Sequence, residues 1–355
     1  MSVHEVEIVV VGAGQAGLSS AHHLRRAGFE PGPGFAVLDA DAGPGGAWRH
    51  RWPSLRLGEV HGIHDLPGFA LTERDGSRPA SAVLSEYFDR YEREFGLDVR
   101  RPVRVRAVRR GPGGRLLVES GDETWSARAV INATGTWSKP FVPRYPGQEE
   151  FAGRQLHVAG YRGAAEFRGS RVAVVGGGIS AVELLTEIAE VGATTWVTRR
   201  PPVFGDREFT PELGRRAVAE VERRVRDGLP PGSVVSATGL PPTPAVLRAR
   251  ERGVLDRLPM FERITPAGLR WADGREVEVD VILWATGFRA ALDHLAPLKL
   301  RERGGGIRVE GTRVLAEPRL HLVGYGPSAS TVGASRAGRA AAREVRELLA
   351  PVTEA

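Results

Sequence analysis

Residues 6–28 read VEIVVVGAGQAGLSSAHHLRRAG, and this stretch decides the fold. The largely apolar run from Val6 to Val11 is typical of a parallel strand that is buried on both faces. A G-x-G-x-x-G turn follows, whose glycines let the backbone approach a pyrophosphate at the start of a helix. These glycines are Gly12, Gly14 and Gly17. The stretch therefore predicts the strand, turn and helix of a dinucleotide-binding unit.

The residues after this turn complete the unit. Leu18, Ala21 and Leu24 recur at helical spacing, and Gly28 stands where a left-handed cap ends a helix. A second strand, FAVLD, then ends in Asp39. Its carboxylate lies about 20 residues beyond the turn, where it can accept a hydrogen bond from a ribose hydroxyl. This order of elements is more specific than the glycine turn alone.

The same pattern occurs a second time in the chain. After a strand at residues 172–175, a G-x-G-x-x-A turn comprises Gly176, Gly178 and Ala181. The strand after the next helix ends in Arg199 and Arg200 instead of an acid. A guanidinium fork suits a ribose 2′-phosphate, so the second site should prefer NADPH, with NADH as the alternative donor.

Two sites that differ at the ribose end imply two different dinucleotides. We therefore predict FAD on the first turn and NADPH on the second, which brings a hydride donor to a flavin. The segments AVINATGT (residues 129–136) and VILWATGF (residues 281–288) each run from a strand into an Ala-Thr-Gly turn. Their turn residues are further predicted cofactor-binding residues: Thr134, Gly135, Thr286 and Gly287.

Composition excludes several other functions. The chain has 355 residues and no cysteine, which rules out disulfides, thiolate metal sites and electron transfer through a Cys pair. Its net charge of +6 comes from arginines spread along the chain, so nucleic-acid binding is not expected. No metal site is predicted. Without a signal sequence or a long apolar run, we expect a soluble cytoplasmic protein without membrane contact.

The segment FAGRQLHVAGY (residues 151–161) carries a sequence pattern that narrows the class of protein. Phe151, Gly153, His157 and Tyr161 fit the pattern F-x-G-x-x-x-H-x-x-x-[YF], just before the second glycine turn. By this pattern the chain resembles the flavin-containing monooxygenases, especially their short bacterial members, within the two-dinucleotide-binding-domain flavoproteins. In that family His157 and Tyr161 would position the domains and the nicotinamide dinucleotide.

The resemblance covers nearly the whole chain. PGGAWRHRWPSLRL (residues 44–57) is similar to the segment that covers the flavin, which implies a flavin contact for Gly46 and Trp48. The helix expected at residues 333–349 would point its N-terminus at the flavin, with Thr331 and Val332 at its entry. A homodimer is implied by the resemblance alone.

The expected fold is α/β, with two Rossmann-like dinucleotide-binding domains. The FAD-binding domain would comprise residues 1–155 and 289–355, and the NAD(P)H-binding domain, residues 156–288, would be inserted into it. Residues 201–262 are rich in Pro and Arg around a helix expected at residues 215–226. They are open to two interpretations, a substrate lid or a surface excursion.

The resemblance also implies the chemistry. NADPH would reduce FAD, O2 would form a C4a-hydroperoxyflavin, and its outer oxygen would pass to a small sulfide or amine. Larger members carry an Asn where counting from WPSL places Gly58. The candidate catalytic residues are Gly58, Trp48, Arg49 and Trp52.

Alternatives remain open at this point. They are an NADPH oxidase or flavin reductase that releases H2O2, and Baeyer–Villiger oxidation of a ketone. A flavin-binding sensor would not need the second glycine turn, and disulfide reduction is excluded by the missing cysteines.

Overall fold

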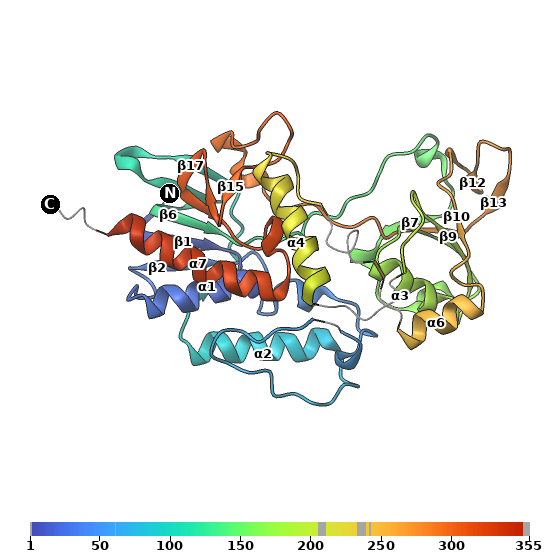
Figure 1. Cartoon of the computed structure of the whole chain (residues 1–355), viewed down its shortest axis with the longest axis horizontal. Helices are drawn as coiled ribbons and strands as arrows, with labels where there is room; N and C mark the ends of the chain where they lie inside the picture. Colours follow the sequence, from blue (N-terminus) through green and yellow to red (C-terminus); the bar gives the residue numbers. More distant parts are fainter. Residues whose placement is uncertain (1, 61, 205–210, 233–238, 241–242, 351–355) are drawn as a thin grey trace. The chain divides into compact units, whose positions relative to one another are not determined.

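The structure is a computed structural model that describes residues 2–60, 62–204, 211–232, 239–240 and 243–350 (Figure 1). The chain divides into two compact units. Unit 1 comprises Met1–Ser138, Ala219–Gly232 and Ala290–Ala355, and unit 2 comprises Lys139–Val218 and Ser233–Arg289.

Unit 1 is built on one large sheet. Its parallel part has the order β3-β2-β1-β6-β17, and an antiparallel pair, β16 and β15, extends it beyond β17. The hairpin β4-β5 joins the sheet through β6. The strands are β1 (Ser2–Val11), β2 (Phe35–Leu38), β3 (Val99–Arg100), β4 (Ala107–Arg110), β5 (Leu116–Ser120), β6 (Glu123–Asn132), β15 (Val309–Glu310), β16 (Arg313–Val314) and β17 (Glu317–Leu322).

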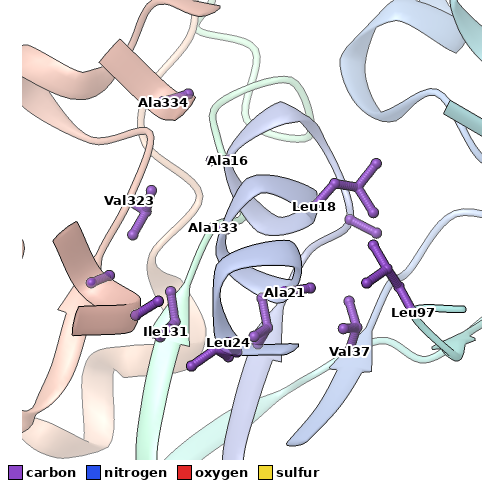
Figure 2. Packing of buried hydrophobic residues seen from close by; sticks show 14 of the residues in the cluster. Ala16, Leu18, Ala21, Leu24, Val37, Leu97, Ile131, Ala133, Val323 and Ala334 are labelled. Carbon is purple, nitrogen blue, oxygen red and sulfur yellow. The ribbon is translucent and has the colours of Figure 1, made fainter. Parts of the chain in front are cut away.

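Unit 1 contains helices α1 (Gln15–Arg26), α2 (Ala80–Glu94) and α7 (Thr331–Leu349). α1 packs along α7, and Gly338 of α7 comes so close to Ser19 that a Cβ atom there would lie 2.7 Å from the Ser19 hydroxyl oxygen. Figure 2 shows the apolar side chains of α1 against those of the neighbouring strands. The short 3-10 helices of this unit are η1 (Gly46–His50), η2 (Leu57–Glu59), η3 (Pro112–Gly114), η7 (Asp293–Leu298) and η8 (Gly326–Ser328).

Strand β1 is buried on both faces, as its apolar run predicts. Ile8 and Val10 belong to the apolar cluster that includes α1, α2 and α7, whereas Val9 and Val11 belong to a second cluster on the other face. Side chains of a strand alternate between faces, so an almost continuous apolar run is the pattern required of a central strand with two covers.

Unit 2 has a smaller sheet in which every pairing is parallel, in the order β10-β9-β8-β14-β7. A separate antiparallel sheet, β11-β12-β13, contributes side chains to the apolar cluster on one face. The strands are β7 (Arg154–His157), β8 (Arg171–Val175), β9 (Ala193–Val197), β10 (Arg257–Leu258), β11 (Arg263–Thr265), β12 (Gly268–Arg270), β13 (Glu276–Glu278) and β14 (Val281–Trp284). The helices are α3 (Ile179–Ile188), α6 (Pro244–Glu251), η4 (Gln148–Glu150), η5 (Val158–Gly160) and η6 (Ala164–Phe167).

The two units share one arrangement of strands. The strand before each glycine turn lies between the strand that ends at the ribose-side residue and the strand that ends in Ala-Thr-Gly, as β2-β1-β6 in unit 1 and β9-β8-β14 in unit 2. This confirms the predicted α/β class with two Rossmann-like units. It also places each glycine turn beside an Ala-Thr-Gly turn.

The two compact units divide at Ser138/Lys139, whereas the sequence predicted a domain boundary at residues 155/156. Residues 139–155 pack within unit 2, because Phe151 lies in its apolar cluster and Ala152 N–H donates to the Pro266 carbonyl. Residues 219–232 pack within unit 1 although the prediction placed them in the inserted domain. There the C-terminal half of α4 (Pro211–Arg226) buries Val225 in the second apolar cluster of unit 1.

The predicted lid or surface excursion at residues 201–262 lies partly outside the described residues, at 205–210, 233–238 and 241–242. The helix expected at residues 215–226 is present as α4, which begins earlier, at Pro211.

Replacing Gly17 with Ala should destabilise the fold, because a Cβ atom there would lie 1.8 Å from the Gly12 carbonyl oxygen. Overpacking of this kind typically costs about 1–3 kcal/mol of unfolding free energy. Urea unfolding of the Gly17→Ala variant measures this loss. Gly160→Ala is the matched control, since a Cβ atom at Gly160 would meet no described atom within 4 Å. Equal stability of both variants would contradict the close approach.

Candidate functional site

A cavity of about 420 Å³ in unit 1 collects most of the residues that the sequence predicted for the first dinucleotide. Its walls come from the first glycine turn, the end of β2, η1, the Ala-Thr-Gly turn after β6 and the start of α7. The predicted residues in its lining are Gly12, Gly14, Asp39, Gly46, Trp48, Thr134, Gly135 and Thr331. Segments far apart in the sequence therefore meet at one site.

Close backbone contacts shape one end of this cavity. A Cβ atom on Gly12 would lie 2.6 Å from the Ala133 carbonyl oxygen, and one on Gly46 would lie 2.7 Å from the Gly14 Cα atom. Gly12 and Gly46 also have positive φ angles, of 99° and 52°. Side chains at these positions would push the walls apart, so glycine is required by both space and conformation. Gly17 lies behind the turn against Gly12 and has a packing role.

The start of α1 at this cavity suits an anionic group. Among the described residues, no side chain caps the helix at Gly14, and the first turn carries no acid. The first backbone N–H groups of a helix lack partners within it and carry a partial positive charge. A pyrophosphate would satisfy them, so the residues present fit the dinucleotide that the sequence predicted.

Asp39 is held in place by backbone donors. Its Oδ2 atom accepts from Ala13 N–H at 2.6 Å and its Oδ1 atom accepts from Asp41 N–H at 2.8 Å. The residue is buried, yet it lines the cavity. A carboxylate oxygen can accept more than one hydrogen bond, so each keeps capacity for a ribose hydroxyl.

A buried relay that the sequence did not predict runs along the same wall. His294 Nε2 lies 2.6 Å from Asn132 Oδ1, Asn132 Nδ2 donates to Thr134 Oγ1 at 3.1 Å, and Thr134 Oγ1 donates to the Ala291 carbonyl at 2.8 Å. The direction of this chain makes Asn132 Oδ1 an acceptor, so Nε2 carries the His294 proton. Burial lowers the pKa of His294 from 6.5 to about 4 and keeps the ring neutral.

Arg51 is a second cavity residue that the sequence did not single out. Its guanidinium carbon lies 4.9 Å from the ring centre of Trp137, 5.7 Å from that of Trp48 and 5.8 Å from that of Trp52. Cations near aromatic faces are attracted by the ring quadrupoles. Because so many arginines occur nearby in the sequence, only the spatial arrangement distinguishes Arg51 from its neighbours.

The four predicted catalytic residues lie in different places. Trp48 lines the cavity, and Trp52 is buried behind Arg51. Arg49 is exposed and donates to the Pro44 carbonyl at 3.1 Å. Gly58 is exposed and lies outside the cavity lining; its N–H donates to Gly76 at 3.0 Å, and a Cβ atom would meet the Gly76 backbone at 3.3 Å.

The predicted helix entry is present at α7. Ser330 caps the helix by accepting from Gly333 N–H at 3.0 Å, and Thr331 Oγ1 donates to the Gly62 carbonyl. Ser330 and Thr331 line the cavity, whereas Val332 lies outside its lining. The Ser330 hydroxyl therefore satisfies one N–H group in the first turn of α7, whereas no described side chain caps the start of α1.

The second glycine turn in unit 2 repeats the geometry of the first. A Cβ atom on Gly176 would lie 2.1 Å from the Ala285 carbonyl oxygen, and Gly178 starts α3 with no capping side chain among the described residues. Ala181 is buried in the first turn of α3. Arg199 and Arg200 follow β9 and are exposed to solvent. The arrangement offers helix N–H groups for a pyrophosphate and two accessible cations after β9.

His157 links the segment of residues 151–161 to the Ala-Thr-Gly turn of residues 281–288 in unit 2. Ala159 N–H donates to His157 Nδ1 at 3.1 Å, so the proton lies on Nε2, which donates to the Gly287 carbonyl at 3.0 Å. Burial lowers the pKa of His157. Thr286 Oγ1 donates to the Phe141 carbonyl. These side chains thus hold the chain's own backbone around the Ala-Thr-Gly turn.

Tyr161, the last residue of the same segment, is buried in unit 2. Its ring stacks on Phe167 with ring centres 5.6 Å apart. Burial, followed by the nearby Glu187 carboxylate, raises the pKa of Tyr161. Both features describe a packed, neutral side chain.

Metal-ligand clusters and membrane-spanning helices are both absent from the described residues. No group of three or more His, Cys, Asp or Glu side chains there could hold a metal ion. No helix in the described part of the chain is long and apolar enough to cross a membrane.

Comparison with known proteins agrees with this geometry. The family model for pyridine nucleotide-disulphide oxidoreductases matches residues 9–227. A double mutant of the flavin monooxygenase from Stenotrophomonas maltophilia is 41% identical to the chain, with 98% of this chain and 100% of that chain covered and a TM-score of 0.83.

More distant relatives extend the comparison. An indole-3-pyruvate monooxygenase from Oryza sativa subsp. indica is 28% identical over 344 residues, which cover 85% of this chain and 80% of the relative. The open crystal structure of cyclohexanone monooxygenase is 18% identical, with 98% of this chain and 87% of that chain covered and a TM-score of 0.66. At that identity the likeness concerns the fold alone.

Buried, neutral His294 should make stability depend on pH. In the unfolded chain His294 takes up a proton below about pH 6.5, whereas in the folded chain it does so only near pH 4. The contribution of neutral His294 to the unfolding free energy is therefore fully present above pH 6.5 and is lost as the pH falls toward 4. Relative to His294→Gln, which keeps a donor toward Asn132, the wild type should lose about 2 kcal/mol of unfolding free energy between pH 7 and pH 5. Urea unfolding at both pH values tests this. The exposed residue His64, changed to Gln, is the control, and a parallel pH dependence of wild type and His294→Gln would refute the assignment.

Proposed function

The chain belongs to the pyridine nucleotide-disulphide oxidoreductase family, as one of its flavin-containing monooxygenases, and we propose that it uses NADPH and FAD to oxygenate a small sulfide or amine. The observation that carries this proposal is the convergence of the glycine turn, Asp39, the Ala-Thr-Gly turn and the start of α7 on one cavity. The missing cysteines exclude the dithiol relay of a disulfide reductase.

FAD is assigned to the cavity of unit 1. The uncapped start of α1 would hold its pyrophosphate, and Asp39 would accept from its adenosine ribose. When bound and reduced, FAD would react with O2 and supply the oxygen-transfer chemistry of the family that the sequence resembles. The chain's own part would be to bind and orient the cofactor and to limit access of water.

NADPH is assigned to the glycine turn of unit 2. The uncapped start of α3 would hold its pyrophosphate, and the exposed Arg199 and Arg200 would bind the 2′-phosphate. His157, Tyr161, Thr286 and Gly287 would support this site by holding the backbone near it. We further propose that the enzyme acts on small molecules and O2 as a cytoplasmic homodimer.

One observation favours a second candidate, an NADPH oxidase that releases H2O2. Gly58 carries no polar side chain and lies outside the cavity lining, against Gly76. Position 58 therefore offers no side-chain hydrogen bond to an oxygen donor, which would favour release of H2O2 over oxygen transfer to a substrate. Product analysis distinguishes the three candidate reactions. An oxidase releases H2O2, Baeyer–Villiger oxidation of a ketone gives an ester, and oxygenation of a sulfide gives a sulfoxide.

Stopped-flow absorbance tests the proposed reaction. The purified flavoprotein is reduced anaerobically with NADPH and then mixed with O2. A transient hydroperoxyflavin band, followed by one sulfoxide per NADPH when a sulfide is present, is the expected result. Direct return to oxidised flavin, with H2O2 equal to NADPH consumed whatever substrate is added, would instead establish the oxidase.

Replacing both Arg199 and Arg200 with Ser should impair the use of NADPH more than the use of NADH. Loss of even one charge-assisted hydrogen bond to a phosphate, which contributes about 1.5–3 kcal/mol, should lower kcat/KM for NADPH by at least about 10-fold. The value for NADH, which lacks the 2′-phosphate, should change little. Arg168→Ser, at another exposed arginine of unit 2, is the matched control. An equal loss with both donors would count against the assignment.

A further inference from the structure

Three charged side chains lie together beside the cavity, although the sequence predicted only one of them. The side chains of Asp39, Arg101 and Glu92 are 8%, 11% and 12% exposed. The Arg101 guanidinium forms two hydrogen bonds to the Glu92 carboxylate, at 2.6 and 2.7 Å. Its Nη2 atom lies 4.0 Å from Asp39 Oδ2, beyond hydrogen-bond distance. The fork of Arg101 is thus turned to Glu92.

The backbone fixes Arg101 and Asp39 beside each other. Asp39 N–H donates to the Arg100 carbonyl at 3.0 Å, and Val103 N–H donates to the Asp39 carbonyl at 2.7 Å. Glu92 comes from a different element, α2, where Tyr91 next to it is fully buried. The separation between the Arg101 fork and Asp39 therefore depends on a third side chain that is anchored independently.

If the Arg101 guanidinium moved closer to Asp39, it would donate hydrogen bonds to the carboxylate lone pairs of Asp39 that the backbone does not occupy. Each of its carboxylate oxygens accepts one backbone N–H, and the rest faces the cavity. A buried guanidinium that loses its partner turns to the nearest available carboxylate, because an unpaired buried charge is strongly unfavourable. The other carboxylate that acts on Arg101 is Asp41, which already contacts His50 Nε2 at 2.9 Å.

We propose that Glu92 is a positioning residue that holds Arg101 off Asp39, so that Asp39 can accept from the adenosine ribose of FAD. The inference rests on the proposed assignment of FAD to this cavity. It extends the site to α2, whose sequence carries no dinucleotide-binding motif. Glu92 determines affinity for the adenosine half of the cofactor without touching it.

The test compares FAD with its analogue that lacks the adenosine 2′-hydroxyl. Dissociation constants are measured by reconstituting the deflavinated full chain. The wild type should bind FAD about tenfold more tightly than the analogue, in line with one hydrogen bond to a charged group. Glu92→Leu should lose about tenfold in FAD affinity and most of this discrimination. The double variant Glu92→Leu/Arg101→Leu should regain both, because the competing cation is gone.

Controls separate this role from a structural one. Glu94→Leu removes an exposed charge from the same helix and should behave as wild type. Glu92→Gln keeps the side-chain volume and one acceptor for Arg101, so it should lose less FAD affinity and less discrimination than Glu92→Leu. It serves as the second test if Glu92→Leu does not fold. A double variant as weak as Glu92→Leu, or wild-type discrimination in folded Glu92→Leu or Glu92→Gln, would overturn the proposal. A wild-type chain that fails to bind FAD would overturn the proposed function instead.

Discussion

The structure depends on one kind of contact, in which the first glycine of a glycine turn lies directly on the carbonyl of an Ala-Thr-Gly turn. Gly12 meets Ala133 in unit 1, and Gly176 meets Ala285 in unit 2. A Cβ atom at either glycine would lie within 2.6 Å of the alanine oxygen. This contact brings together the ends of two neighbouring parallel strands, the edge at which open α/β sheets bind their ligands.

The neighbouring threonines show how each unit uses the same device. Thr134 Oγ1 donates to the Ala291 carbonyl, and Thr286 Oγ1 donates to the Phe141 carbonyl. Backbone groups repeat the pairing, because Ala291 N–H donates to Gly135 and Phe141 N–H donates to Gly287. In both units the hydroxyl is thus engaged by the segment that passes over the turn. Each threonine side chain therefore holds a neighbouring segment against its own Ala-Thr-Gly turn.

Buried polar groups around the cavity of unit 1 are satisfied in two different ways. His294 is neutral and forms one link in a directed chain of hydrogen bonds that ends at the Ala291 carbonyl. Asp39 and Glu92, by contrast, lie near Arg101, whose guanidinium pairs with Glu92 at 2.6 Å and lies 4.0 Å from Asp39. A buried group without a partner would cost more than either arrangement. These polar groups of the wall therefore have partners within the chain, and Asp39 keeps acceptor capacity toward the cavity.

The sequence by itself determined the two nucleotide-binding units, and most of the residues that it predicted for the first dinucleotide line the cavity of unit 1. Glycine spacing, the apolar run of β1 and the position of Asp39 are local patterns, and each follows from the backbone needs of a strand, a turn and a helix. Tertiary structure alone decided the rest. Arg101, Glu92, Arg51 and His294 carry no local signal, because their roles arise from neighbours many positions away in the chain. Likewise, the second half of α4 packs in unit 1 through Val225, since burial depends on which surface the folded chain offers and not on sequence order.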